Sequence, residues 1–300
     1  MPTERRNILT VGKKSMKWIP VIMILPIVLI RGFTTIYPIL VTMLNSLYNI
    51  KVLSGIHEFT GLSNYVNVFK DDKIISSIKF TAIFVIVSMV FHVVLGVILA
   101  LILNMKLKGR RFLRTIVLIP WAMPAVVIGM AAKWGFNNDY GLINDFIRRF
   151  FSDFQYNWLI NKGSARAAVI AMDLWKDLPF FAILVLSGLQ FISGDIYEAA
   201  KVDGANSFQS FKRITLPLII RNVLTLCIPF TLWRLTSFDL VYAMTSGGPG
   251  EDTSLIAYRI AMESFTNLNI GYASTLAIML FIVMVFFSWF NIRFMRRYTE

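Results

Sequence analysis

The segment from Glu198 to Pro217 is the part of this chain whose residue types and spacing suggest a specific chemistry. It is polar and helix-prone, and it lies between two long apolar runs. A carboxylate such as that of Glu198 can pair with a cationic side chain, and aromatic side chains can fill a socket. Small residues beside them allow another backbone to approach closely. The segment therefore predicts a docking surface for another protein and not a catalytic centre.

Local signals predict two short helices in this segment. The pairs Asp195/Glu198 and Asn206/Gln209 both have capping-box spacing, so we expect one helix to begin at Ile196 and a second after Asn206. Gly204 suits the end of the first helix, where a positive φ is needed. Pro217 fits the first turn of the apolar run that follows. The expected result is a helix–turn–helix lying along the membrane surface.

A simpler interpretation of the same residues is also open. Phe208 and Phe211 are three positions apart and are expected to share one helix face. In the simpler interpretation Glu198 only caps its own helix and the two aromatic rings pack beneath the loop.

Composition places most of the chain in a membrane. The sequence has 300 residues, is 56% hydrophobic and has a mean hydropathy of +0.65, whereas soluble domains average about 45–50% apolar residues. The excess is gathered in runs, which is typical of a bilayer-spanning chain. The net charge of +13 comes from basic residues at the ends of these runs and not from a stripe, so we expect no nucleic-acid partner.

Six apolar runs are long enough to cross a bilayer. They are 19–48, 79–104, 113–136, 166–192, 217–242 and 271–292. We expect an all-α polytopic membrane protein with six transmembrane helices. Its parts are a basic N-terminus (1–18), a membrane domain (19–292) containing the loop 193–216 between the fourth and fifth helices, and a basic C-terminus (293–300). Lys and Arg gather on the side of the termini and the loop, which predicts that all three are cytoplasmic.

Enzymatic chemistry has little support in the sequence. The single cysteine, Cys227, lies in an apolar run, and the two histidines, His57 and His92, are far apart. No Cys/His cluster, phosphate-binding glycine loop or nucleophile elbow is present. We expect no catalytic residue, no metal and no cofactor on this chain, and we interpret His92 as a hydrogen-bonded packing residue.

The spacing within the loop resembles the cytoplasmic "EAA" coupling loop of membrane subunits in bacterial ATP-binding-cassette importers. The resemblance implies that this loop docks into a partner ATPase. The expected contact residues are Glu198, Ala199, Ala200, Asp203, Gly204, Ala205, Phe208, Phe211, Ile214, Leu216 and Pro217. All of these except Phe208 match the family pattern.

Further motifs resemble one branch of that family, the permeases of maltose-type carbohydrate importers. They include Trp175, Pro179-Phe180, Gly247-Gly248-Pro249-Gly250 and Gly271-Tyr272-Ala273. The resemblance implies a multi-pass subunit of the bacterial cytoplasmic membrane, surrounded by lipid, that imports a sugar or oligosaccharide. The implied partners are a second related permease, an extracytoplasmic solute-binding protein and two ATPase subunits. ATP and Mg would be held by those ATPase subunits.

Ionisable residues inside the apolar runs are expensive in a bilayer and need a partner or water. Asp173, Lys176 and Asp177 share one helix face and can pair with one another. Arg31 and Arg234 lie deep in their runs and have no such neighbour.

A sugar path needs hydrogen-bonding groups and aromatic faces, and the run 217–242 contains both. We expect part of a set to line the path: Arg31, Thr231, Trp233, Arg234, Thr236, Ser237, Asp239 and Tyr242. If Arg31 and Arg234 both face it, an anionic sugar such as a uronate joins the neutral sugars as a candidate cargo. The alternatives are that Arg234 pairs with Asp239 to hold helices together, or that the partner permease lines most of the path.

Two rival functions stay open at this point. One is an importer of the same class for a solute other than a sugar. The other is an ion-coupled secondary transporter, which needs no ATPase-docking loop and often shows internal repeats. No internal repeat stands out in this sequence.

Overall fold

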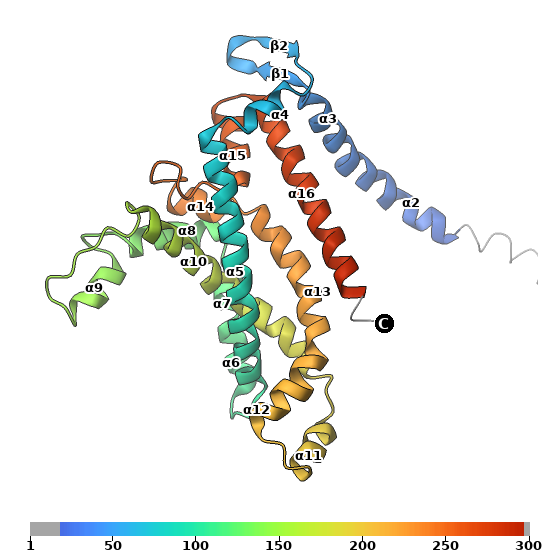
Figure 1. Cartoon of the computed structure of the whole chain (residues 1–300), viewed down its shortest axis with the longest axis vertical. Helices are drawn as coiled ribbons and strands as arrows, with labels where there is room; N and C mark the ends of the chain where they lie inside the picture. Colours follow the sequence, from blue (N-terminus) through green and yellow to red (C-terminus); the bar gives the residue numbers. More distant parts are fainter. Residues whose placement is uncertain (1–18, 297–300) are drawn as a thin grey trace, which may run out of the picture.

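Helices dominate the chain, as expected. The computed structural model describes residues 19–296, so the predicted basic N-terminus at 1–18 lies outside the described residues. Figure 1 shows an elongated bundle with a small β-hairpin at one end and α11 at the other. The long helices of the bundle are α5 (Asp72–Asn104), α10 (Lys162–Leu189), α13 (Leu216–Leu235) and α16 (Ile270–Arg296).

Shorter helices connect the long ones. They are α4 (Ser63–Val68), α6 (Arg110–Val117), α7 (Ile119–Ala122), α8 (Ala125–Gly135), α9 (Leu142–Arg148), α11 (Gly194–Val202), α12 (Ser207–Ser210), α14 (Asp239–Met244) and α15 (Ile256–Ala261). Two π-helical turns, η1 (Gly32–Ile36) and η3 (Phe211–Thr215), join helices into longer rods. A third, η4 (Met262–Thr266), extends α15, and η2 (Val52–Ser54) is a 3₁₀ turn.

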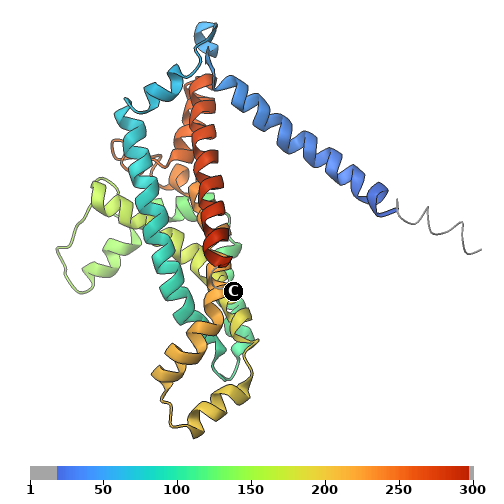
Figure 2. The same cartoon turned by 45° about the vertical axis from the view of Figure 1, so that its right-hand side comes forward.

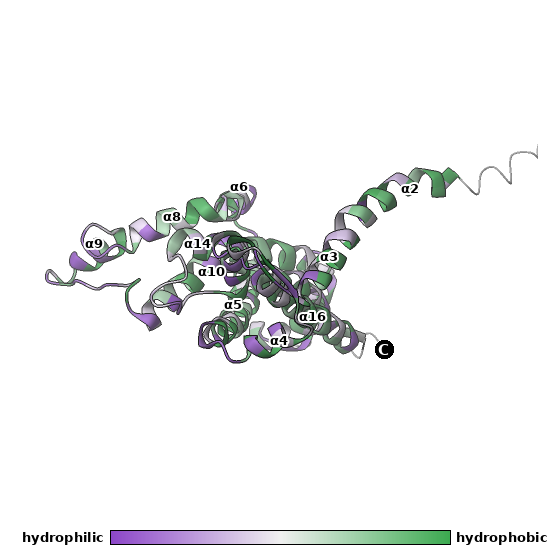
Figure 3. Cartoon of the chain, turned by 90° about the horizontal axis from the view of Figure 1, so that it is seen from above, coloured by the Kyte–Doolittle hydropathy of each residue, from purple (hydrophilic) through white to green (hydrophobic). Residues whose placement is uncertain are grey.

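The first apolar run forms one helical rod, Ile19–Asn45, from α2 (Ile19–Arg31), η1 and α3 (Tyr37–Asn45). Both side views show that it leaves the bundle and projects away from it (Figures 1 and 2). Seen from above, α2 is largely apolar and stands apart from the other helices, whereas α3 lies beside the start of α16 (Figure 3). No residue of the rod's most apolar stretch is buried in this chain.

Within residues 19–296, four helical rods are long and apolar enough to cross a membrane: Ile19–Asn45, Asp72–Asn104, Ser207–Leu235 and Ile270–Met295. A fifth span results if the pair Arg110–Ala122 and Ala125–Gly135, bent by 86°, counts as one. α10 has the length but carries Asp173, Lys176 and Asp177, so composition alone does not mark it as a span. The count of six transmembrane helices stays a prediction.

The bend in the predicted span 113–136 has a local cause. Met123 leaves the helical region with ψ 139°, and Pro124, with ψ 137°, is the N-cap that precedes α8. The residue before a proline disfavours the helical conformation, and proline itself donates no backbone hydrogen bond. The two arms therefore meet at a sharp angle.

The predicted span 217–242 is too long at its C-terminal end. α13 ends at Leu235, and the chain turns before α14 begins at Asp239. Asp239 lies in the first turn of α14, where a carboxylate is favourable to the helix dipole. At the end of the chain the difference is opposite, because α16 continues to Arg296, past the predicted end at 292.

A β-hairpin that the sequence analysis did not anticipate follows the first rod. Strands β1 (Tyr48–Lys51) and β2 (Ile56–Phe59) pair antiparallel, with Tyr48 opposite Phe59. Gly55, at φ 65°, makes the turn. The hairpin packs on the start of α16, where a Cβ on Gly271 would overlap the Tyr48 carbonyl oxygen.

Two apolar clusters hold the bundle together. One lies where α5 and α10 meet α8, α14 and α15, with Phe80, Phe84 and Val241 fully buried. The other joins α5, α10 and α13 around Phe181 and Phe230. Helices α5 and α10, which carry polar groups described in the next section, are thus held in place by both clusters.

Candidate functional site

The first helix of the loop 193–216 begins before Ile196, the start that the capping-box spacing of Asp195 and Glu198 predicted. α11 starts at Gly194, and its N-cap is Ser193, whose hydroxyl accepts a hydrogen bond from the Asp195 amide at 3.3 Å. The predicted cap at Asp195 is therefore wrong. Ser193 has the extended backbone (φ −61°, ψ 138°) that brings its hydroxyl to the orphan amides.

The turn between the two helices is as predicted. Gly204 has φ +79°, and the amides of Gly204 and Ala205 bond to the carbonyls of Lys201 and Ala200 at 3.0 and 2.8 Å. Asn206 and Gln209 form a reciprocal capping box with bonds of 2.8 and 2.9 Å. The backbone hydrogen-bonding groups at the end of the first helix and the start of the second thus find partners within the loop.

The second helix of the loop is not separate from the following span. α12, η3 and α13 form one rod, Ser207–Leu235, with Pro217 in the first turn of α13. The Tyr197 hydroxyl lies 2.9 Å from that of Thr215 and braces α11 against this rod. The loop is therefore continuous with α13 through its second helix and contacts the same rod through its first.

The exposed side chains of the loop argue against the simpler interpretation. Glu198 is exposed and makes no hydrogen bond or ion pair with another described residue, so it does not cap its own helix. Phe208 is 71% exposed, whereas Phe211 packs against the cluster of α5, α10 and α13. Only Phe211 therefore packs beneath the loop, as the simpler interpretation has it, and Phe208 does not. Val202, 88% exposed at the end of α11, is an apolar surface residue that the sequence analysis missed.

The other predicted contact residues divide between surface and interior. Ala199, Asp203, Gly204 and Pro217 are exposed or half-buried, Ala205, Ile214 and Leu216 are at least partly covered, and Ala200 is 9% exposed. A buried residue such as Ala200 cannot touch a partner protein and affects the docking surface only through the packing beneath it.

A buried charge cluster lies between α5, α10 and α13. The Arg234 side chain is 1% exposed; its Nε donates to Asp173 Oδ2 at 3.0 Å and its Nη1 to the Phe230 carbonyl at 2.9 Å. His92 Nδ1 lies 2.7 Å from the Ser88 carbonyl, so it is the donor there. Its Nε2 is then free to accept from Arg234 Nη2 at 2.6 Å. His92 is thus a hydrogen-bonded packing residue, as predicted.

One expectation about these charges is wrong, and another holds only in part. Arg234 pairs with Asp173, and at 3.7 Å with Asp177, but not with Asp239. Asp173 does not pair within its own helix; Lys176 bonds to Asp177 at 2.8 Å and leaves Asp173 to Arg234. Three helices are joined through one guanidinium.

The residues expected to line a path are not brought together. Thr231 and Arg234 are buried, whereas Trp233 and Tyr242 are about half exposed and Asp239 is exposed on α14. Ser237, half-buried, and Thr236, exposed, lie in the turn after α13. Arg31 lies on the projecting rod, so it does not meet Arg234 (Figures 1 and 2).

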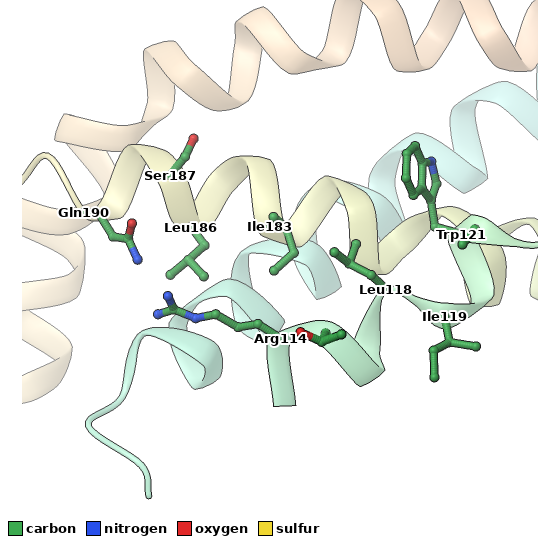
Figure 4. A pocket seen from close by; sticks show the side chains of 10 residues that line it. Arg114, Leu118, Ile119, Trp121, Ile183, Leu186, Ser187 and Gln190 are labelled. Atoms are coloured by element: carbon green, nitrogen blue, oxygen red, sulfur yellow. The ribbon is translucent and has the colours of Figure 1, made fainter. Parts of the chain in front are cut away.

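A pocket of about 630 Å³ opens between α6, α7 and α10 (Figure 4). Arg114 and Gln190 lie at one end and Trp121 at the other. Trp121 stacks on Phe180 with 4.1 Å between ring centroids, and Phe180 lies 6.4 Å from Trp233. The pocket thus offers hydrogen-bonding groups beside aromatic faces. It escaped the sequence analysis because its walls come from segments far apart in the chain.

No group of three or more His, Cys, Asp or Glu side chains that could hold a metal occurs among the described residues.

Residues 92–300 match the family described as "Binding-protein-dependent transport system inner membrane component". The chain is 37% identical over 267 residues to the trehalose/maltose transport system permease protein MalF of Thermococcus litoralis, covering 89% of this chain and 90% of that protein. It is 32% identical to the sulfoquinovosyl glycerol transport system permease protein SmoG of Agrobacterium fabrum, covering 87% and 85%. It is 28% identical to the sn-glycerol-3-phosphate permease UgpA of the same organism, covering 80% and 81%.

The fold is also similar to that of a solved transporter. A chain in the crystal structure of a bacterial alginate ABC transporter, in complex with alginate pentasaccharide-bound periplasmic protein, superposes with a TM-score of 0.83. The two chains are 21% identical, and the match covers 97% of this chain and 98% of that one. At this identity the similarity concerns the fold alone.

Proposed function

Because this chain belongs to the family of binding-protein-dependent transport system inner membrane components, we propose that it is the membrane-spanning subunit of an ATP-driven importer for a sugar or oligosaccharide. The names of the trehalose/maltose and sulfoquinovosyl glycerol permeases support a saccharide cargo. Its partners are a second permease, an extracytoplasmic solute-binding protein and two ATPase subunits that hold ATP and Mg. The chain itself carries out no covalent chemistry.

The observation that carries this proposal is the loop 193–216. Glu198, Val202 and Phe208 project from a compact helix–turn–helix without partners in the described chain. Exposed apolar side chains beside a carboxylate suit a protein partner. The positive-inside rule puts this loop on the cytoplasmic side, where an ATPase works.

The coupling mechanism follows from the continuity of the rod Ser207–Leu235. ATP binding closes the two ATPase subunits and carries the loop with them. α13 then moves as a rigid lever, and Arg234 transmits the displacement to α10 and α5 through Asp173 and His92. The bundle passes between inward-facing and outward-facing states, and ATP hydrolysis resets it.

The pocket between α6, α7 and α10 is the part of this chain best suited to face the sugar path. Trp121 offers a ring for a pyranose, and Gln190 and Ser187 offer hydrogen-bonding groups at the exposed surface. Trp233 continues the aromatic row through Phe180. In this arrangement Arg234 supports the path from behind and does not touch the sugar.

A phosphorylated polyol is the second candidate cargo. The relative UgpA is named for sn-glycerol-3-phosphate, and Arg114 at the end of the pocket is a cation that could pair with a phosphate. Uptake of radiolabelled maltose and of glycerol-3-phosphate by the same vesicles separates the two cargoes.

The test is purification of the tagged chain from its native membranes in mild detergent, with the co-purifying proteins identified by mass spectrometry. We expect an ATPase and a second permease, and loss of the ATPase when Glu198→Ala, Val202→Ser and Phe208→Ala are combined. Lys162→Ala, at the other end of the bundle, is the control. A stable complex of this chain alone would favour a secondary transporter.

A further inference from the structure

We propose that a second saccharide site lies at the end of the bundle opposite α11, in a polar cavity of about 540 Å³ beside the β-hairpin. Its walls come from β1, α4, the turn between α4 and α5, and the segment Glu263–Tyr272, and we call it the hairpin pocket. Every side chain that lines it is polar or charged. It shares no lining residue with the pocket of α6, α7 and α10, and β1 and α4 lie at the hairpin end of the bundle, away from α6 and α7 (Figure 1).

The frame of the hairpin pocket is rigid. Lys51 of β1 forms a β-bridge with Asn269, and the Val52 amide bonds to the Leu268 carbonyl at 3.0 Å. The Asn64 side-chain amide donates to the Tyr48 carbonyl at 2.9 Å, and Gly271 packs against the same backbone. A pocket held in this way is formed before a ligand arrives, which lowers the entropic cost of binding.

Several polar groups of the hairpin pocket do not contribute to the fold. The side chains of Asn49, Lys51, Asn67 and Lys70 make no hydrogen bond or ion pair within residues 19–296. Asn269 Oδ1 is buried and also lacks a partner there. Polar groups gathered from separate segments and left unpaired are available to a ligand.

The balance of charge selects the class of ligand. Lys51 and Lys70 lie beside Asp71 and Glu263. Glu263 also pairs with Arg259, which pairs with Glu251 in turn. These three cations and three anions balance, so the hairpin pocket favours neither an anion nor a cation. The other lining groups are amides and hydroxyls, which suit hydroxyls that both donate and accept. Tyr272 donates its hydroxyl to Asp71 at 3.2 Å, and its ring packs against the apolar cluster around Val68 and Ile74, which fixes the hydroxyl in the pocket wall. A neutral saccharide meets both conditions, the balanced charge and the lining of amides and hydroxyls.

This inference rests on the proposed function only for the choice of a saccharide as the hydroxylated ligand. The test uses the full chain in lipid nanodiscs, with maltose observed by saturation-transfer difference NMR. Trp121→Ala removes the contribution of the other pocket, so the remaining signal reports on the hairpin pocket. Adding Asn67→Leu, which keeps the side-chain size and removes the amide, is expected to weaken maltose binding about tenfold.

Asn157→Leu, in an exposed loop far along the chain, is the matched control and should leave the signal unchanged. Lys70→Met, checked for an unaltered melting temperature, is a second variant in the pocket. Two outcomes would overturn the proposal. One is the absence of a maltose signal in Trp121→Ala, and the other is a signal in Trp121→Ala that stays the same when Asn67→Leu is added. Displacement of maltose by inorganic phosphate would overturn the saccharide assignment. Uptake by the reconstituted importer tests the proposed function separately.

Discussion

Arg234 of α13 and Asp173 of α10 form an ion pair in the interior of the bundle, with 3.0 Å between Nε and Oδ2. The two side chains are 1% and 7% exposed. The guanidinium also bonds to His92 of α5, so one residue ties three helices together deep inside the bundle.

Removal of Arg234 alone should be strongly destabilising. Arg234→Met leaves the Asp173 carboxylate buried without a partner, which costs about 3–5 kcal/mol, and the double variant Arg234→Met/Asp173→Leu should recover much of that loss. Thermal unfolding in detergent measures both. Lys162→Ala breaks the bond to Asp252 at a site where the lysine is 59% exposed, and should cost less than about 1 kcal/mol. Equal losses in the two single variants would contradict this account of the cluster.

Gly204 should tolerate asparagine but not proline. Its φ of +79° is accessible to Asn, whereas Pro requires about −65°. Nothing lies within 4 Å of an added Cβ, so crowding plays no part. The outcome depends on the backbone conformation and, for proline, also on the lost amide bond to the Lys201 carbonyl. We expect Gly204→Pro to abolish assembly with the ATPase or to uncouple ATP hydrolysis from uptake, and Gly204→Asn to retain both. Normal uptake per ATP hydrolysed in Gly204→Pro would rule out the rigid lever.

Phe208 and Phe211 should respond differently to alanine. Phe208→Ala removes an exposed ring, so the melting temperature should hold while the yield of co-purified ATPase falls. Phe211→Ala removes a ring packed against α5, α10 and α13, and should destabilise the chain by about 2 kcal/mol or more. The reverse pattern would mean that Phe208 does not face the partner.

Gly271 should be intolerant of any side chain. A Cβ there would overlap the Tyr48 carbonyl oxygen and push the hairpin off α16. Gly271→Ala is expected to lower stability by about 1–3 kcal/mol, as overpacking does. Gly163→Ala, in the first turn of α10 with open space around it, is the control and should be neutral or slightly stabilising. Similar melting temperatures for the two variants would contradict the close approach.

Trp121 should affect transport more than stability. We expect Trp121→Ala to reduce maltose uptake by the reconstituted importer about tenfold, because the sugar ring loses a stacking face worth about 1 kcal/mol or more. Trp121→Phe should retain most uptake. Trp289→Ala, at an exposed position on α16, is the control. If Trp289→Ala lost uptake and Trp121→Ala did not, the sugar path would have to lie beside α16 and not at the pocket of Trp121.

Features governed by neighbouring residues could be predicted from the sequence. The capping box of Asn206 and Gln209 and the positive φ of Gly204 depend on a few consecutive residues, and both are present. The helical membrane fold follows from long apolar runs, because a backbone in lipid must satisfy its own hydrogen bonds. The spacing around Glu198 is sufficient by itself to indicate the family, since it is a pattern of residues within one short segment.

Features that join distant segments were decided by the tertiary structure alone. Sequence spacing suggested Asp239 as the partner of Arg234, but packing brings Asp173 to it from 61 positions away. The same holds for the pocket of Trp121 and Gln190 and for the burial of Phe211 beside an exposed Phe208. Local propensity does not determine which helix faces meet. The fit of side chains between α5, α10 and α13 determines it. That fit also decided which polar residues hold the helices together and which stay available to a ligand.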